Sequence, residues 1–129
     1  MIEILFVFLA IHELACYHRL MSKGLDELKA AIDLLADVDP NELTDAEVHE
    51  LVVTVQRQRN RLAAFAAEAI SSWDQRMVWS DIGAGSAAVR LANDTSASPS
   101  STGFQVKRAR RLRSMPLVAA AVSDRHLRA

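Results

Sequence analysis

The chain has 129 residues, of which 50% are hydrophobic, and its 15 basic and 16 acidic side chains leave a formal net charge of −1. This length and composition suit about one globular domain with a modest core. The single cysteine, Cys16, excludes a disulfide framework within the chain and favours a reducing, cytoplasmic setting. The apolar residues are mainly Ala, Leu and Val, so we predict an all-α fold with several shorter helices packed against one long helix.

The charges are unevenly distributed along the chain. The part before Phe104 holds eight basic and fifteen acidic side chains, a net charge of −7, whereas the remainder holds seven basic and one acidic, a net charge of +6. Such asymmetry is informative about partners and solubility and says little about fold.

The first twenty residues stand apart from the rest of the sequence. The apolar run 1–11 is too short for a membrane span, is followed by His12 and Glu13, and lacks the features of a signal peptide. We consider two interpretations equally: a helix packed on the body, or residues added by an upstream start codon with Met21 as the true start. A membrane anchor is less favoured than either. We therefore treat 1–43 as an amino-terminal helical extension, without a functional role for 1–20, and 44–129 as the main domain.

Helical spacing dominates the middle of the chain. Apolar residues recur over 25–36 and predict an amphipathic helix that ends before an Asp39-Pro40-Asn41 turn. Thr44 and Glu47 form a capping box that starts a helix of some thirty residues, ending near Arg76. Arg59 lies on the apolar stripe of this helix, and we expect its stem to pack while its charged head reaches solvent or a carboxylate.

Shorter helices are predicted after the long one. Gly83-Ala84-Gly85 predicts a turn, and Ser86 can cap a helix that runs to about Ala92. The Ser/Thr-rich stretch 93–103 predicts a polar break of eleven residues, within which Ser98 and Pro99 are candidates for the start of the next helix. That helix is expected to end near Met115. Pro116 then begins a short helix, and 123–126 resembles the first turn of another.

The helix that ends near Met115 carries the strongest candidate site, a nucleic-acid-binding surface. Lys107, Arg110 and Arg111 share one helical face, with Arg108 and Arg113 at its margins. Arginine forks match phosphate oxygens, so this face predicts salt-dependent DNA contact without base specificity. The preceding short helix gives the outline of a helix-turn-helix, although an eleven-residue break is too long for that motif. The alternative is a solvated basic face, paired with acidic surface of this or another chain.

No catalytic or cofactor-binding constellation is found in the sequence. The segment from His12 to His18 imitates a zinc motif, but Cys16 replaces its second histidine, and further ligands would have to come from His49 or His126. Asp74 and Asp81 are predicted to cap and solvate a turn, with no catalytic role. Trp73 and Trp79 are predicted to anchor the core. We expect no catalytic residue, metal, cofactor, small-molecule ligand or membrane partner.

The order of several short motifs resembles the actinobacterial domain of unknown function 222, the helical region of the 13E12 repeat proteins. The similarity extends from about Thr44 to Arg128. It rests on the following residues: Leu51-Val52, Trp73-Asp74, Trp79, Gly83, Gly85-Ser86-Ala87-Ala88, Arg90-Leu91-Ala92, Ala109-Arg110-Arg111-Leu112 and Met115-Pro116.

The resemblance implies a DNA-associated setting, because in that family the helical region is commonly followed by a His-Asn-His nuclease module. The four histidines of this chain form no such motif, so nuclease activity is not transferred to it. We expect a non-catalytic helical module that contacts DNA. The alternatives are a structural or protein-interaction module, and a degenerate fragment of a nuclease. Apolar faces left uncovered by missing later helices would promote self-association or a homo-oligomer.

Overall fold

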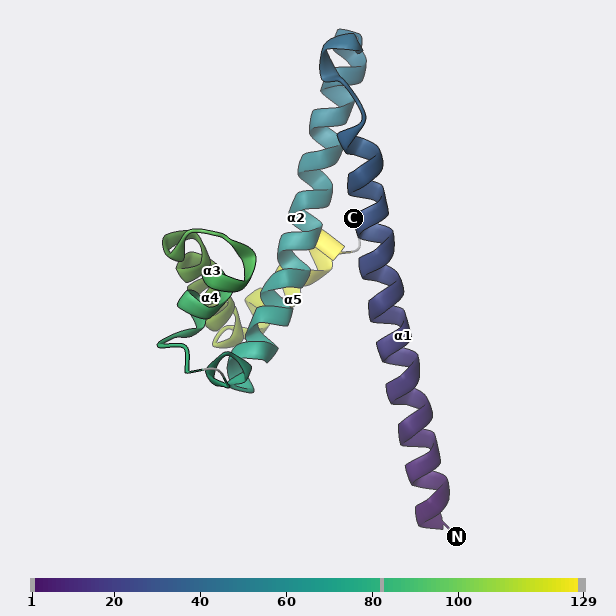
Figure 1. Ribbon diagram of the computed structural model, residues 1–129, viewed down its shortest axis with the longest axis vertical. Helices are drawn as coiled ribbons and strands as arrows, with labels where there is room; N and C mark the ends of the chain where they lie inside the picture. Colours follow the sequence, from purple (N-terminus) through teal and green to yellow (C-terminus); the bar gives the residue numbers. More distant parts are fainter. Residues whose placement is uncertain (1, 82, 128–129) are drawn as a thin grey trace. The chain divides into compact units, whose positions relative to one another are not determined.

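The computed structural model describes residues 2–81 and 83–127, and in these residues it is all-α, with no strand. Five helices follow one another: α1 (Ile2–Ala36), α2 (Asp45–Gln75), α3 (Ala87–Thr95), α4 (Pro99–Arg113) and α5 (Pro116–Leu127) (Figure 1). Two short 3₁₀ turns, Pro40–Glu42 and Val78–Ser80, precede and follow α2. The predicted fold class is confirmed. The chain divides into two compact units, Met1–Val48 and His49–Ala129.

The first unit consists of α1, the Pro40–Glu42 turn and the start of α2. α1 runs from Ile2 to Ala36 without a break, so the amphipathic helix predicted over 25–36 is the last third of a longer one. Its exposed surface carries two ion pairs, Lys23 with Glu27 and Lys29 with Asp33, and the two residues of each pair are four positions apart. Such pairs support a helix by about 0.2–0.5 kcal/mol each.

The start of α2 matches the predicted capping box. The Glu47 carboxylate accepts from the Thr44 amide at 2.9 Å and from the Thr44 hydroxyl at 2.7 Å, and the Glu47 amide donates to that hydroxyl at 3.4 Å. These hydrogen bonds lower the pKa of Glu47. They satisfy amide groups that have no partner inside the helix, and this explains why α2 begins where the sequence predicts.

The second unit is held together by close contacts between small side chains. Its buried apolar residues come from α2, α3 and α4: Ala64, Ala67, Ala87, Ala92, Val106 and Ala109. Trp73 and Trp79, predicted as core anchors, are half-buried. Because alanine adds one carbon beyond the backbone, helices that meet through it approach one another closely. The core of this unit is therefore small, and it leaves apolar side chains such as Leu62 and Phe104 exposed.

Three predictions for the carboxy-terminal helices are corrected by the structure. α3 continues to Thr95 and α4 begins at Pro99, so the expected break over 93–103 is reduced to residues 96–98. Ser96 makes this short turn possible by adopting a left-handed conformation (φ 54°). α5 runs from Pro116 to Leu127 as one helix, so no separate helix begins at 123.

Candidate nucleic-acid interface

The basic helix α4 is positioned by its contacts with α3. The Ser98 hydroxyl accepts from the Ser101 amide at 3.2 Å and caps the helix, with Pro99 in its first turn. One turn later the buried Thr102 hydroxyl donates to the Ala88 carbonyl of α3 at 2.8 Å. A short helix, a three-residue turn and a second helix thus pack together, and this is the order of elements in a helix-turn-helix. The objection raised by an eleven-residue break no longer applies.

Two of the five predicted DNA-binding residues anchor α4 to α2. Arg110 donates to the Asp74 carboxylate through Nε at 2.9 Å and through Nη2 at 2.6 Å. Arg113 lies 3.5 Å from the same carboxylate and donates to the Ser71 carbonyl at 3.4 Å. Both arginine side chains therefore have partners within the fold, which lowers their capacity to neutralise phosphate.

Asp74 is the buried partner in this arrangement. Its side chain is 6% exposed, and the two hydrogen bonds from Arg110 lower the pKa of its carboxyl against the opposing effect of burial. The same pair raises the pKa of Arg110. The prediction that Asp74 caps and solvates the turn after α2 is therefore wrong. It serves as an internal counter-charge for α4, whereas Asp81 is exposed as expected.

The other three predicted residues lie on the exposed face of α4. Lys107, Arg108 and Arg111 are all exposed and form no ion pair with a described residue. Phe104 precedes them by three, four and seven positions, so the four side chains follow one helical stripe. Phe104 is 69% exposed, which is unusual for an aromatic residue. We call Phe104, Lys107, Arg108 and Arg111 the basic stripe.

The aromatic member of the basic stripe was missed by the sequence analysis. Its signal was present, because an apolar residue at position 104 falls on the charged face of the helix, opposite Val106 and Ala109. An aromatic ring among cations can pack against a base or sugar while the cations hold phosphates.

A groove adjoins the basic stripe. It has a volume of about 540 Å³ and lies between α2 and α4. Arg59 of α2 and Arg108 of α4 both border it, and Leu62, Ile70 and Phe104 contribute apolar surface. Arg59 is exposed, in agreement with the prediction that its charged head leaves the apolar stripe of α2. The groove therefore combines an apolar lining with positive charge.

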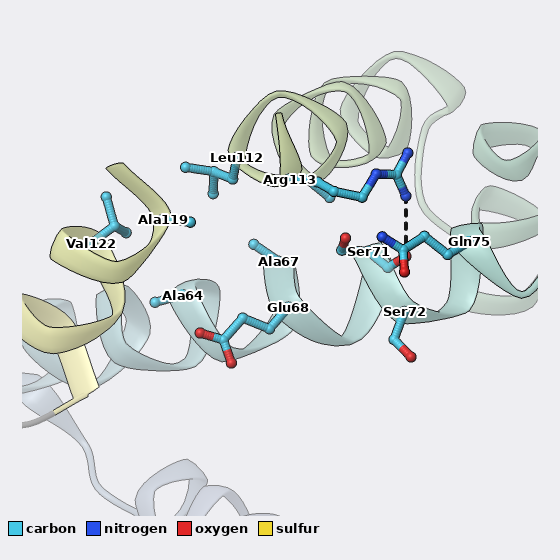
Figure 2. Close-up of a pocket in the computed structure, with 11 residues that line it drawn as sticks. Ala64, Ala67, Glu68, Ser71, Ser72, Gln75, Leu112, Arg113, Ala119 and Val122 are labelled. Atoms are coloured by element: carbon cyan, nitrogen blue, oxygen red, sulfur yellow. Dashed lines mark hydrogen bonds between the residues drawn. The ribbon is translucent and has the colours of Figure 1, made fainter. Parts of the chain in front are cut away.

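A second cavity, of about 290 Å³, lies between α2, α4 and α5. Figure 2 shows small and apolar side chains around it, with Arg113 reaching from α4 to the Ser71 carbonyl of α2. The described residues of the lining include Glu68 and no histidine, cysteine or second carboxylate, so they offer no pair of side chains for acid–base catalysis.

The zinc-like segment does not come together as a metal site. His12, Cys16 and His18 are exposed on α1, and the described residues contain no group of three or more His, Cys, Asp or Glu side chains that could hold a metal ion. The side chain of His126, a further candidate, lies outside the described part. α1 is also long and apolar enough to cross a membrane, by length and composition alone.

No protein-family model, curated protein or solved structure matches this chain. The resemblance to the domain of unknown function 222 thus rests on its short motifs and stays a prediction. Several of those motif residues have structural roles, since Asp74 pairs with Arg110 while Ala87, Ala92 and Ala109 are buried.

Proposed function

We propose that this chain is a non-catalytic helical module that binds DNA through the basic stripe of α4. The proposal rests on the observation that the five basic residues of α4 fall into two groups. Arg110 and Arg113 hold the helix in place, and Lys107, Arg108 and Arg111 are left facing solvent. A rigidly held helix presents its cations at fixed spacing, which is what contact with successive phosphates requires.

The packing of α3 on α4 supports the same function. A helix-turn-helix presents its second helix to the DNA, and here the second helix is the one that carries the basic stripe. The Ser98 side chain caps α4 and the Thr102 side chain faces α3, and the stripe begins only at Phe104. We therefore propose contact with the DNA backbone rather than reading of a base sequence.

Salt-dependent binding to a short DNA duplex tests this proposal. If Lys107, Arg108 and Arg111 each neutralise one phosphate, the logarithm of the binding constant should fall with the logarithm of salt concentration with a slope of about −2.7. Lys107→Ala combined with Arg111→Ala should reduce this slope to about −0.9 and weaken binding at low salt. Fluorescence anisotropy of a labelled duplex measures both quantities.

The matched control removes the same charge from another surface. Arg57→Ala combined with Arg76→Ala changes two exposed arginines of or next to α2 and alters the net charge equally. It should leave the slope near the wild-type value. An equal loss of DNA binding in both double variants, or DNA binding that does not depend on salt, would show that the basic stripe has no specific role.

A protein-interaction module is the second candidate, favoured by the groove beside the stripe. Its apolar lining and flanking Arg59 and Arg108 suit an acidic amphipathic helix. The two functions separate at Leu62, a 45% exposed lining residue that carries no charge. Leu62→Ala should preserve DNA binding, whereas weaker binding of an acidic amphipathic peptide by this variant would favour the groove as the functional surface.

A further inference from the structure

α1 carries a seam of apolar residues that the proposed function does not use. Starting at Val7 the seam positions recur at alternating intervals of four and three residues over four heptads, and one of the nine is polar. The seam consists of Val7, Ile11, Leu14, His18, Met21, Leu25, Leu28, Ile32 and Leu35. A repeat of this kind is the signature of a coiled coil, in which each seam side chain inserts between side chains of the facing helix.

Within the first unit, nothing covers the apolar residues of the seam. The exposed fractions of its apolar members range from 37% for Leu28 to 69% for Leu14. The four acidic residues of the same stretch, Glu13, Asp26, Glu27 and Asp33, fall on helical positions away from the seam. Alanines flank the seam at residues 10, 15, 31 and 36, so a second helix can approach closely. One side of α1 is thus built to face another helix.

We propose that α1 pairs in parallel with α1 of a second copy of this chain. The seam consists of two alternating sets of positions. The set at 11, 18, 25 and 32 holds isoleucine twice (Ile11 and Ile32), and the other set includes Leu14, Leu28 and Leu35. β-Branched residues in the first set with leucine in the second favour parallel two-stranded coiled coils. In such a pair each position meets its own copy, so His18 meets His18. A single polar seam residue fixes register and strand number at some cost in stability.

Connectivity requires the parallel partner to come from another chain. α1 is about 52 Å long at 1.5 Å per residue. Residues 37–44, which connect α1 to α2, span at most about 28 Å when fully extended. Parallel pairing of α1 with α2 would need the start of α2 to lie beside the start of α1. The connection is too short to span that distance. A second copy supplies an identical helix in the required direction.

The proposal is tested by measuring the oligomeric state of the protein and of two matched variants. Sedimentation equilibrium should show a dimer of the full chain. Ile32→Asp places a carboxylate in the seam and should raise the dissociation constant by about a hundredfold or more. Leu34→Asp makes the same change two residues away, on a 72% exposed side chain outside the seam, and should leave the dimer intact. His18→Leu should tighten it, and circular dichroism should show that all variants stay helical.

Cysteine cross-linking tests the direction of pairing. In the Cys16→Ser background, Leu35→Cys places one thiol per chain at the end of the seam, and in a parallel dimer the two thiols face each other. Mild oxidation should then give a covalent dimer in high yield. A monomer at all concentrations, equal disruption by Ile32→Asp and Leu34→Asp, or no cross-link at position 35 would each overturn the proposal. The first of these would favour the α2 stripe as the partner, and the second would favour lipid or non-specific apolar association.

Discussion

At the residue scale, the ion pair between Asp74 and Arg110 distinguishes the charges of α4 that are paired within the fold from those that stay exposed. Helical periodicity correctly placed Arg110 among the polar residues of its helix, but periodicity cannot show which polar residues meet a partner thirty-six positions away. Asp74 lies on a face of α2 next to Trp73, where the sequence gives no sign of an arginine partner. The cations of the basic stripe were predicted from helical spacing, whereas Phe104 and the anchoring role of Arg110 and Arg113 were not.

We expect Asp74→Asn to lower the free energy of unfolding by about 1–3 kcal/mol, because the charge-assisted hydrogen bonds from Arg110 are lost. The lower end of this range is favoured because the Arg110 side chain is 50% exposed and can be solvated in the variant. Urea unfolding followed by circular dichroism measures the change. Asp81→Asn removes an exposed carboxylate nearby and should have little effect, so a similar loss there would argue against the ion pair as the cause.

The same pair should make stability depend on acid pH. Since the folded-state pKa of Asp74 lies below its unfolded value of about 3.9, the pair stabilises the protein fully above that pH. This contribution is lost as the pH falls through the lowered folded-state pKa. The stability difference between wild type and Asp74→Asn should therefore shrink between about pH 5 and pH 2. A difference that stays constant over this range would contradict the assignment.

At the element scale, the helix starts that carry a side-chain cap were predicted correctly. α2 and α4 begin at the expected capping residues, because caps are local hydrogen bonds between residues two or three positions apart. The break between α3 and α4 was predicted too long because Ser and Thr are weak helix formers. The Arg90–Asp94 ion pair and the Thr102 contact with α3 outweigh that weak propensity. The full length of α1 was missed because polar His12 and Glu13 were given too much weight.

The cap at Ser98 provides a direct test of the turn. Ser98→Ala removes the acceptor for the Ser101 amide and should cost about 1 kcal/mol of stability. DNA binding at low salt should weaken in parallel if the turn positions the basic stripe. Ser100→Ala is the control, since the hydroxyl of Ser100 contacts only that of Ser98. Thermal unfolding of the two variants side by side distinguishes loss of a cap from a general effect of removing a serine in α4.

At the scale of the whole molecule, charge separates the two units. Residues 1–48 hold three basic and ten acidic side chains, a net charge of −7, and residues 49–129 hold twelve basic and six acidic, a net charge of +6. Opposite charges on different molecules attract at low ionic strength, and the near-zero total gives little overall repulsion to oppose this. Salt does not weaken association through a seam of apolar residues, because that association does not depend on ion pairing.

We therefore expect light scattering near the sequence pI of about 6.4 to be strongest at low salt and to fall as salt is added. The Ile32→Asp variant should show the same salt effect, because it keeps the charge separation while losing the seam. Scattering that rises with salt in the wild type and disappears in Ile32→Asp would instead show that the seam of α1 causes all of the association.

The alanine-built core of the second unit has a consequence for sequence change. In most proteins a buried position is damaged by truncation, since a shortened side chain leaves a void. Ala87 and Ala109 are each 1% exposed, and the side chain of each is a single methyl group, so truncation can remove very little. Every replacement there except glycine is an enlargement, which would push α3, α4 and α2 apart and shift the anchored arginines with them. Over evolutionary time these positions should resist growth in side-chain volume, while the exposed surface of α4 stays free to vary its charge.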